Sequence, residues 1–112
     1  MEKVTLKIFD DISSLTLEEK ENLLSEIRRR VVELDKEIVR LLGKRAEHSR
    51  LIGKMKSELK IPVFSSEREK EILSKLLESI PQTISKKSLL RIYERILDES
   101  RVIQHEERKK SE

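Results

Sequence analysis

The chain contains no cysteine and no tryptophan, and it has few glycines, prolines and aromatic residues. Without cysteine it can form no disulfide bond and use no thiol chemistry, which fits a reducing compartment. It also lacks any run of about 18 apolar residues, so we expect no membrane span. Lys7, Asp10 and Asp11 interrupt the apolar residues near the N-terminus, which argues against a signal peptide. These absences favour a cytoplasmic protein.

The residues that dominate the chain are charged and aliphatic. Charged residues make up 42% of its 112 positions and hydrophobic residues 36%. This mixture, with so little glycine and proline, is typical of helical bundles and coiled coils, and the length indicates one domain. The net charge is +3, but the basic residues are mixed with 22 acidic ones and no aromatic-rich basic patch accompanies them. We therefore expect an all-α protein that does not bind nucleic acid.

A very long first helix is predicted by the apolar spacing. Thr16 and Glu19 fit a capping box at its start, and no proline follows until Pro62, which ends it after about Leu59. Its apolar seam has heptad spacing of four, three, four and three residues: Ile27, Val31, Leu34, Ile38 and Leu41.

Two shorter helices follow. Ser66 and Glu69 match a second capping box, and Pro81 closes the helix that it begins. Ser85 can cap a third helix. Three helices are therefore expected in a domain over residues 16–108, with a frayed tail at 109–112.

Residues 1–15 form a separate N-terminal extension in this interpretation. Val4, Leu6 and Ile8 alternate with polar residues, which is the period of a half-buried strand. A single strand is not stable alone, so the extension is either a docked strand or mobile.

The length of the first helix predicts an assembly. A helix from Leu17 to Leu59 is about 65 Å long, whereas a compact chain of this size has a radius of gyration of about 13 Å. Two shorter helices cannot cover the apolar face of such a rod. We therefore expect an intertwined homodimeric helical bundle.

Polar residues interrupt the predicted core at positions that can face one another. Arg45 follows the apolar seam, and Lys56 lies only about 20° around the helix from it. In the third helix, Ser100 lies on the seam and Gln104 one turn later. Such a cluster of cations and uncharged donors suits a small anionic ligand, although Arg45 and Lys56 could instead extend along the bundle edge or form salt bridges.

Several segments match a known family in order and spacing. The match covers roughly residues 24–107 and includes Ile27-Arg28, Leu34-Asp35, Leu41-Leu42, Arg45, Ile52-Gly53-Lys54, Lys56, Ile61-Pro62-Val63, Glu67-Arg68-Glu69, Ser100 and Gln104. In these residues the chain resembles the all-helical (type II) chorismate mutases. The resemblance implies an intertwined dimer of three-helix chains that rearranges chorismate to prephenate on the route to phenylalanine and tyrosine. Because this reaction is unimolecular, we expect neither a metal nor a cofactor.

The resemblance also implies roles for the polar core residues. Arg28 looks like the arginine that enters the partner's active site and binds a substrate carboxylate, although its spacing alone favours an exposed residue. Arg45 resembles its counterpart from the pocket's own chain. Lys56 and Gln104 look like the pair that hydrogen-bonds the ether oxygen of the breaking bond.

The proline loop and the helix that follows it complete the implied site. Arg68 resembles a further substrate-side arginine, and Glu69 the carboxylate that contacts the ring hydroxyl. Ser100 matches a pocket serine. Ser65 lies where related bacterial sequences often have an acidic residue, so it can offer a hydrogen bond but no charge. The expected catalytic residues are thus Arg45, Lys56, Glu69 and Gln104.

Two other functions fit parts of this pattern. An isochorismate pyruvate lyase shares the fold and much of the pocket, and it would break the same ether bond without forming the new carbon–carbon bond. A non-enzymatic helical dimer that binds another macromolecule would need none of the pocket residues. The Glu-Arg-Glu segment at 67–69 favours the mutase.

Overall fold

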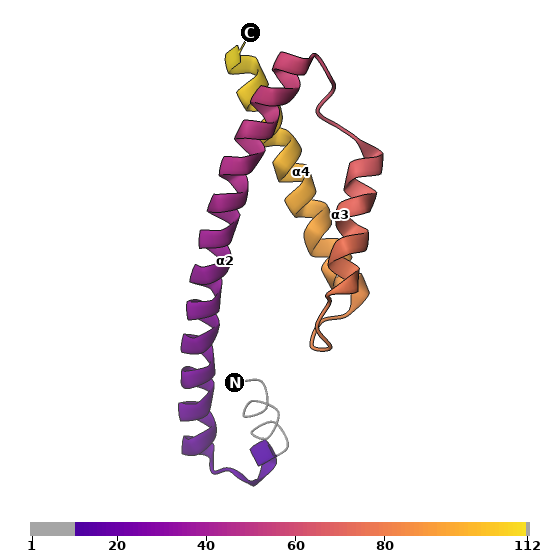
Figure 1. The fold of residues 1–112 in the computed structure, drawn as a ribbon. Coiled ribbons are helices and arrows are strands. Elements are labelled where there is room, and N and C mark those ends of the chain that lie inside the picture. Colours follow the sequence, from indigo (N-terminus) through magenta and orange to yellow (C-terminus); the bar gives the residue numbers. More distant parts are fainter. Residues whose placement is uncertain (1–10, 112) are drawn as a thin grey trace. The chain divides into compact units, whose positions relative to one another are not determined.

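The protein is described by a computed structural model that defines residues 11–111, and it is all-α (Figure 1). A short 3-10 turn, η1 (Ile12–Ser14), precedes the helices α2 (Leu17–Leu59), α3 (Ser66–Glu78) and α4 (Lys86–Ser111). No strand occurs within the range described. The three-helix fold with a very long first helix is therefore confirmed. The strand considered at Val4, Leu6 and Ile8 lies outside the described residues.

The predicted capping box begins α2. The backbone N–H of Glu19 donates to Thr16 Oγ1 at 3.2 Å, and the N–H of Thr16 donates to Glu19 Oε1 at 3.1 Å. These bonds satisfy two amides that have no partner within the helix. The hydrogen bond from the Thr16 backbone also lowers the pKa of the Glu19 carboxyl.

A Schellman turn ends α2. The N–H of Ile61 donates to Lys56 O at 3.1 Å and that of Lys60 to Ser57 O at 3.2 Å. Lys60 has a φ of 56°, in the left-handed region where glycine is usual. The turn directs the chain into the proline loop, which brings Val63 back beside α2.

The start of α3 differs from the prediction. Ser65, not Ser66, is the N-cap: its backbone is extended, with φ −139°, and its Oγ accepts the N–H of Arg68 at 3.2 Å. The expected capping box of Ser66 and Glu69 is therefore wrong. Ser66 is already helical, so its side chain cannot cap, and the Glu69 carboxylate is left for another partner.

The cap of α4 agrees with the prediction, since Ser85 Oγ accepts the N–H of Ser88 at 3.1 Å. The helix includes residues 109–111, for which fraying stays a prediction. None of the described helices is long and apolar enough to cross a membrane. The cytoplasmic location also stays a prediction.

The chain divides into two compact units, one up to Leu41 and one from Leu42 onwards. In the first unit, the N-terminal part of α2 exposes its predicted seam: Val31, Leu34, Ile38 and Leu41 each expose between 47% and 57% of their surface. An apolar stripe of this kind normally faces another protein surface. The homodimer that would cover it stays a prediction.

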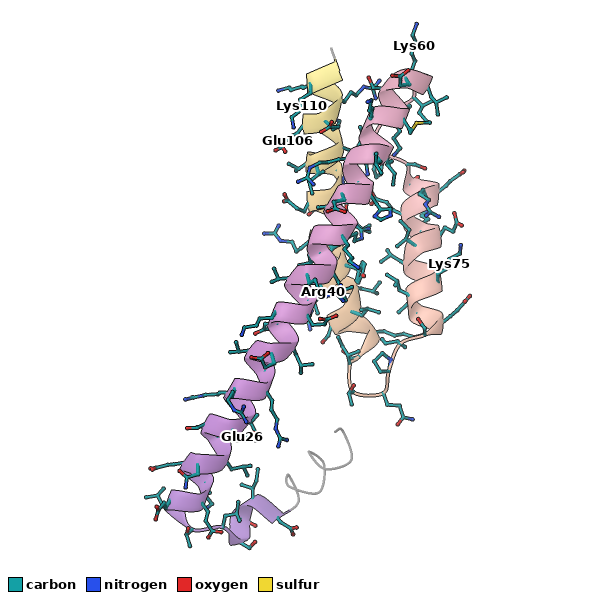
Figure 2. All side chains as sticks on the ribbon, turned by 60° about the vertical axis from the view of Figure 1, so that its left-hand side comes forward. Glu26, Arg40, Lys60, Lys75, Glu106 and Lys110 are labelled. Carbon is teal, nitrogen blue, oxygen red and sulfur yellow. The ribbon has the colours of Figure 1, made fainter. Side chains whose placement is uncertain are left out.

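In the second unit, the C-terminal part of α2 packs with α3 and α4 around an interior that contains both apolar and polar residues. Apolar Val63 and Leu97 are buried there, and so are the polar residues Ser49, Ser100 and Gln104. Charged side chains project from the helix surfaces instead (Figure 2), as Lys75 does on α3. Buried polar groups need partners, so this interior is the place to look for a site.

Candidate active site

A cavity of about 460 Å³ opens in the second unit, between the C-terminal part of α2, the proline loop, α3 and α4. This volume suits a small organic ligand. Its walls combine apolar and charged side chains: Arg45, His48, Ser49, Ile52, Lys56, Val63, Ser65, Arg68, Glu69, Ile72, Leu97, Ser100, Arg101 and Gln104. The structure thus brings together every predicted site residue except Arg28.

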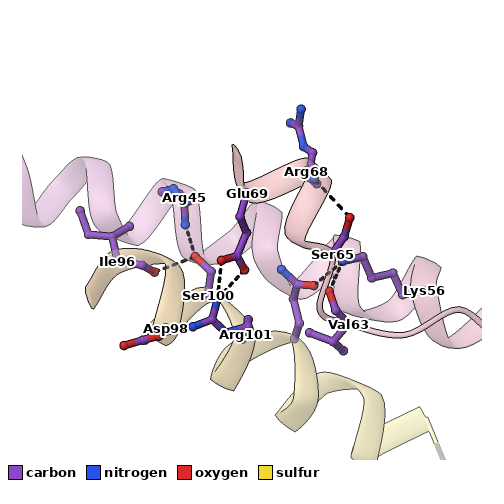
Figure 3. Close-up of polar contacts among 11 residues, drawn as sticks. Arg45, Lys56, Val63, Ser65, Arg68, Glu69, Ile96, Asp98, Ser100 and Arg101 are labelled. Carbon is purple, nitrogen blue, oxygen red and sulfur yellow. Dashed lines mark hydrogen bonds and ion pairs between the residues drawn. The ribbon is translucent and has the colours of Figure 1, made fainter. Parts of the chain in front are cut away.

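Arg45 and Ser100 form one wall. The Arg45 guanidinium donates to Ser100 Oγ, and the Ser100 hydroxyl donates in turn to Ile96 O at 3.0 Å (Figure 3). Within the described part of the chain, no salt bridge pairs Arg45 with a carboxylate. Its charge and its remaining N–H groups are therefore available to an anion.

Lys56 and Gln104 form the second wall. Lys56 Nζ donates to Val63 O at 2.5 Å and to Gln104 Oε1 at 3.1 Å. Because an ammonium only donates, Gln104 must turn its carbonyl oxygen toward Lys56, which leaves its amide nitrogen to donate to a ligand. Two bonds also leave Lys56 one N–H. The wall therefore offers two donors side by side.

Burial affects the charge of Lys56. Desolvation lowers the pKa of its ammonium, the negative charge of Glu69 opposes this, and the positive charge of Arg68 adds to it. Desolvation dominates because water is the best solvent for the charged form.

Glu69 has a partner that the sequence analysis missed. Arg101 Nη1 donates to both Glu69 carboxylate oxygens, at 2.6 and 2.5 Å, and Arg101 Nη2 donates to Asp98 (Figure 3). The Arg101 guanidinium also lies 5.5 Å from the centroid of the Phe64 ring. The bonds to Glu69 are the main reason that the pKa of Arg101 is raised. This arginine fixes Glu69 between α3 and α4.

Arg68 and Ser65 lie at the rim. The Arg68 side chain forms a salt bridge with Glu71 at 3.3 Å, and Figure 3 shows it pointing away from Lys56 and Glu69. Ser65 lines the cavity, and because its Oγ accepts the α3 cap bond, its hydroxyl hydrogen and one lone pair remain for a ligand.

The predicted site residue Arg28 remains to be placed, together with His48, for which no role is predicted. Arg28 lies on α2 in the first unit with an exposed side chain, and its role stays a prediction. His48 lines the cavity, with its Nδ1 2.9 Å from Lys44 O. Since a carbonyl oxygen only accepts, His48 Nδ1 carries the proton. Its other ring nitrogen remains for solvent or a ligand.

The charges of the cavity define what it can bind. Four cations line it, Arg45, Lys56, Arg68 and Arg101, against the single carboxylate of Glu69. Among the described residues, no group of three His, Asp or Glu side chains is placed to hold a metal ion. Arg68 and Arg101 are paired with carboxylates, whereas Arg45 and Lys56 bind only uncharged acceptors, so the arrangement fits a small anionic ligand.

Comparisons with known proteins point to one family. The family described as chorismate mutase type II matches residues 27–105. The chain is 36% identical over 78 residues to a bifunctional chorismate mutase/prephenate dehydratase of Aquifex aeolicus, a match covering 66% of this chain and 22% of that protein. It is 24% identical over 82 residues to a chorismate mutase of Methanocaldococcus jannaschii, covering 72% of this chain and 83% of that protein.

The chain thus spans about a fifth of the length of the Aquifex relative, and most of the length of the Methanocaldococcus relative. No solved structure matches the chain significantly. The family match extends over most of α2 and through α3 to the far end of the cavity on α4, so it includes all of the cavity residues. This chain therefore belongs to the type II chorismate mutase family.

Proposed function

We propose that the chain is a chorismate mutase, an isomerase that converts chorismate to prephenate for phenylalanine and tyrosine synthesis. The observation that carries the proposal is the Lys56–Gln104 pair on the wall of a cavity rich in cations. The family match and the names of both relatives support it.

The proposed reaction is an intramolecular Claisen rearrangement. One ether carbon–oxygen bond breaks as one carbon–carbon bond forms in a cyclic shift of electrons, and no atom leaves or enters. The protein must therefore hold a flexible dianion in its compact, reactive conformer. Arg45 binds one carboxylate in this mechanism, and the partner's Arg28 binds the other. Ser100 holds the Arg45 guanidinium in place.

Lys56 and Gln104, the second wall of the cavity, stabilise the charge on the ether oxygen. Negative charge develops on this oxygen as its bond to carbon breaks, and fixed donors stabilise it without reorganising. The remaining N–H of Lys56 and the amide nitrogen of Gln104 are the proposed donors. Val63 O holds the Lys56 ammonium in position through its 2.5 Å contact. The hydrogen bonds from these donors are stronger in the transition state than in the bound substrate, so they raise kcat.

Glu69 contacts the ring hydroxyl in this proposal, and Arg68 and Ser65 lie at the entrance of the cavity. The Glu69 carboxylate would accept a hydrogen bond from this hydroxyl group while Arg101 holds the carboxylate in place. Arg68 would have to release Glu71 to reach a substrate, which is feasible because both side chains are more than half exposed.

The test compares two lysines of α2 in a chorismate-consumption assay. Lys56→Ala should lower kcat by at least about a hundredfold, since it removes a donor to the ether oxygen and uncouples Gln104. Lys54→Ala is the control, because Lys54 is exposed and does not line the cavity, and it should retain full activity. Normal turnover by a folded Lys56→Ala variant would remove Lys56 from the mechanism.

A further inference from the structure

Gly53 lies where the backbone of α4 comes close to α2 at the site. It is buried, and a Cβ built on it would lie 2.7 Å from Gln104 O and 2.9 Å from Gln104 Cα. These are backbone atoms, so they cannot rotate aside as a flexible side chain can. Any side chain at position 53 would therefore push the two helices apart.

The other glycine of α2 behaves differently. A Cβ on Gly43 would meet no atom within 4 Å. Glycine lowers helix stability at both positions, so only at Gly53 does the packing explain its presence. Gly43 also lies about 200° around the helix from Leu41, away from the apolar seam. It is therefore a matched control.

The contact at Gly53 involves the residue whose side chain forms the site. The backbone of Gln104 touches Gly53, and its side chain reaches Lys56, which lies three residues after Gly53 on a neighbouring face of α2. The distance between the helices at Gly53 therefore sets the distance between Lys56 Nζ and Gln104 Oε1. These two atoms lie 3.1 Å apart.

A methyl group at position 53 would change this distance. Gln104 O must move by roughly 0.7 Å to reach ordinary contact with the new carbon. A displacement of about half that size stretches the Lys56–Gln104 bond to the limit of hydrogen bonding. We propose that Gly53 is a positioning residue, which holds Gln104 at hydrogen-bond distance from Lys56 by admitting the α4 backbone against α2. This inference rests on the proposed mutase function.

The effect should fall on turnover more than on binding. Lys56 and Gln104 act on charge that develops in the transition state, whereas Arg45 binds a carboxylate that is charged throughout. Gly53→Ala should lower kcat about 10- to 100-fold, the loss typical of a small misplacement, and change KM by less than about threefold. Gly43→Ala should keep both constants.

The experiment is a double-variant cycle that measures kcat and KM for chorismate, with kcat corrected for the folded fraction measured by circular dichroism. If Gly53 acts through Gln104, Gly53→Ala should lower kcat less than about threefold in a Gln104→Ala background. A general structural defect would instead lower it by the same factor in both backgrounds, and that result would overturn the proposal.

Two other outcomes are also decisive. If Gly53→Ala folds poorly, the double variant Gly43→Ala/Gly53→Ala gains helix propensity at an open position and takes its place. A double variant that still fails to fold would assign Gly53 to the fold and overturn the positioning role. Full activity in a folded Gly53→Ala variant would also overturn the positioning role. Failure of the wild-type chain to make prephenate would instead contradict the proposed function.

Discussion

At the scale of single residues, the cavity depends on lysine and arginine side chains held in unequal environments. Lys56 is desolvated and bound by two oxygen acceptors, whereas Arg45 is bound by a hydroxyl. Burial lowers the pKa of the Lys56 ammonium, so its protonation can limit activity at alkaline pH.

The pH dependence of activity follows from the direction of the Lys56 shift. Its pKa is lowered from the ordinary lysine value of 10.5. The ammonium is present below the folded pKa, so kcat/KM, which reports the free protein, should fall as pH rises, beginning below 10.5. A kcat/KM–pH profile measures this. If the Lys56→Arg variant is active, its activity should no longer fall at alkaline pH. An unchanged fall in this variant would show that another group causes it.

Arg101 gives a second prediction at this scale. Arg101→Met removes both N–H bonds to Glu69 and should lower kcat/KM about tenfold, because the carboxylate loses its orientation. Stability should fall by about 1 kcal/mol, less than for a buried pair because both side chains are partly exposed.

Urea unfolding and chorismate kinetics test this prediction against Lys75→Met. Lys75 belongs to an exposed pair with Glu71 on α3, so its loss should leave both measurements nearly unchanged. If Arg101→Met behaved like this control, Arg101 would have no part in placing Glu69.

At the scale of the helices, the two adjacent serines at the start of α3 have different roles, because only Ser65 caps the helix. Ser65→Ala should lower stability by about 1 kcal/mol, since the Arg68 N–H loses its acceptor. Ser66→Ala should change stability by less than about 0.5 kcal/mol, because its side chain makes no cap bond and alanine favours the helix. Denaturant unfolding of the two variants measures the difference, and equal losses would contradict the assignment of the cap.

Much of each helix could be predicted from the sequence, because the signals are local. Thr16 and Glu19 lie within one turn, and Pro62 restricts its neighbour directly. The cap of α3 could not be assigned so simply, since Ser65 and Ser66 have the same chemistry and only the extended backbone of Ser65 distinguishes them. The left-handed turn at Lys60 has no sequence signal, because glycine is the usual residue there.

The site was predictable where it follows helical spacing. Arg45 and Lys56 share a face of α2, and Ser100 and Gln104 share one of α4, so packing those faces brings all four together. Arg101 was missed because Glu69 lies on another helix and Phe64 in a loop, and the chain has many arginines with spacing like that of Arg101 and Asp98. The local signals are its place beside Ser100, three residues before Gln104, and the acidic Asp98 one turn earlier.

At the scale of the whole molecule, the exposed seam of α2 and the implied role of Arg28 lead to the same proposal. A second copy of the chain would cover Val31, Leu34 and their neighbours, and bring its Arg28 to the cavity. Sedimentation should therefore give the mass of a dimer, and a stable monomer at assay concentrations would contradict the shared site.

Mixing two inactive variants tests whether the site is shared. Arg28→Ala keeps its own Arg45, and Arg45→Ala supplies Arg28, so each heterodimer should contain one intact site. After unfolding and refolding together, an equal mixture should recover about a quarter of wild-type activity. Recovery should be absent when each variant is refolded alone. If the mixture stays inactive although heterodimers form, Arg28 does not act across the interface.

The most direct test of the central claim is to incubate the wild-type chain with chorismate and identify the product by NMR. We predict that chorismate disappears as prephenate appears in equal amount, with no added metal or cofactor. A parallel incubation with isochorismate covers the competing lyase. Unchanged chorismate, or salicylate and pyruvate from isochorismate alone, would contradict the account.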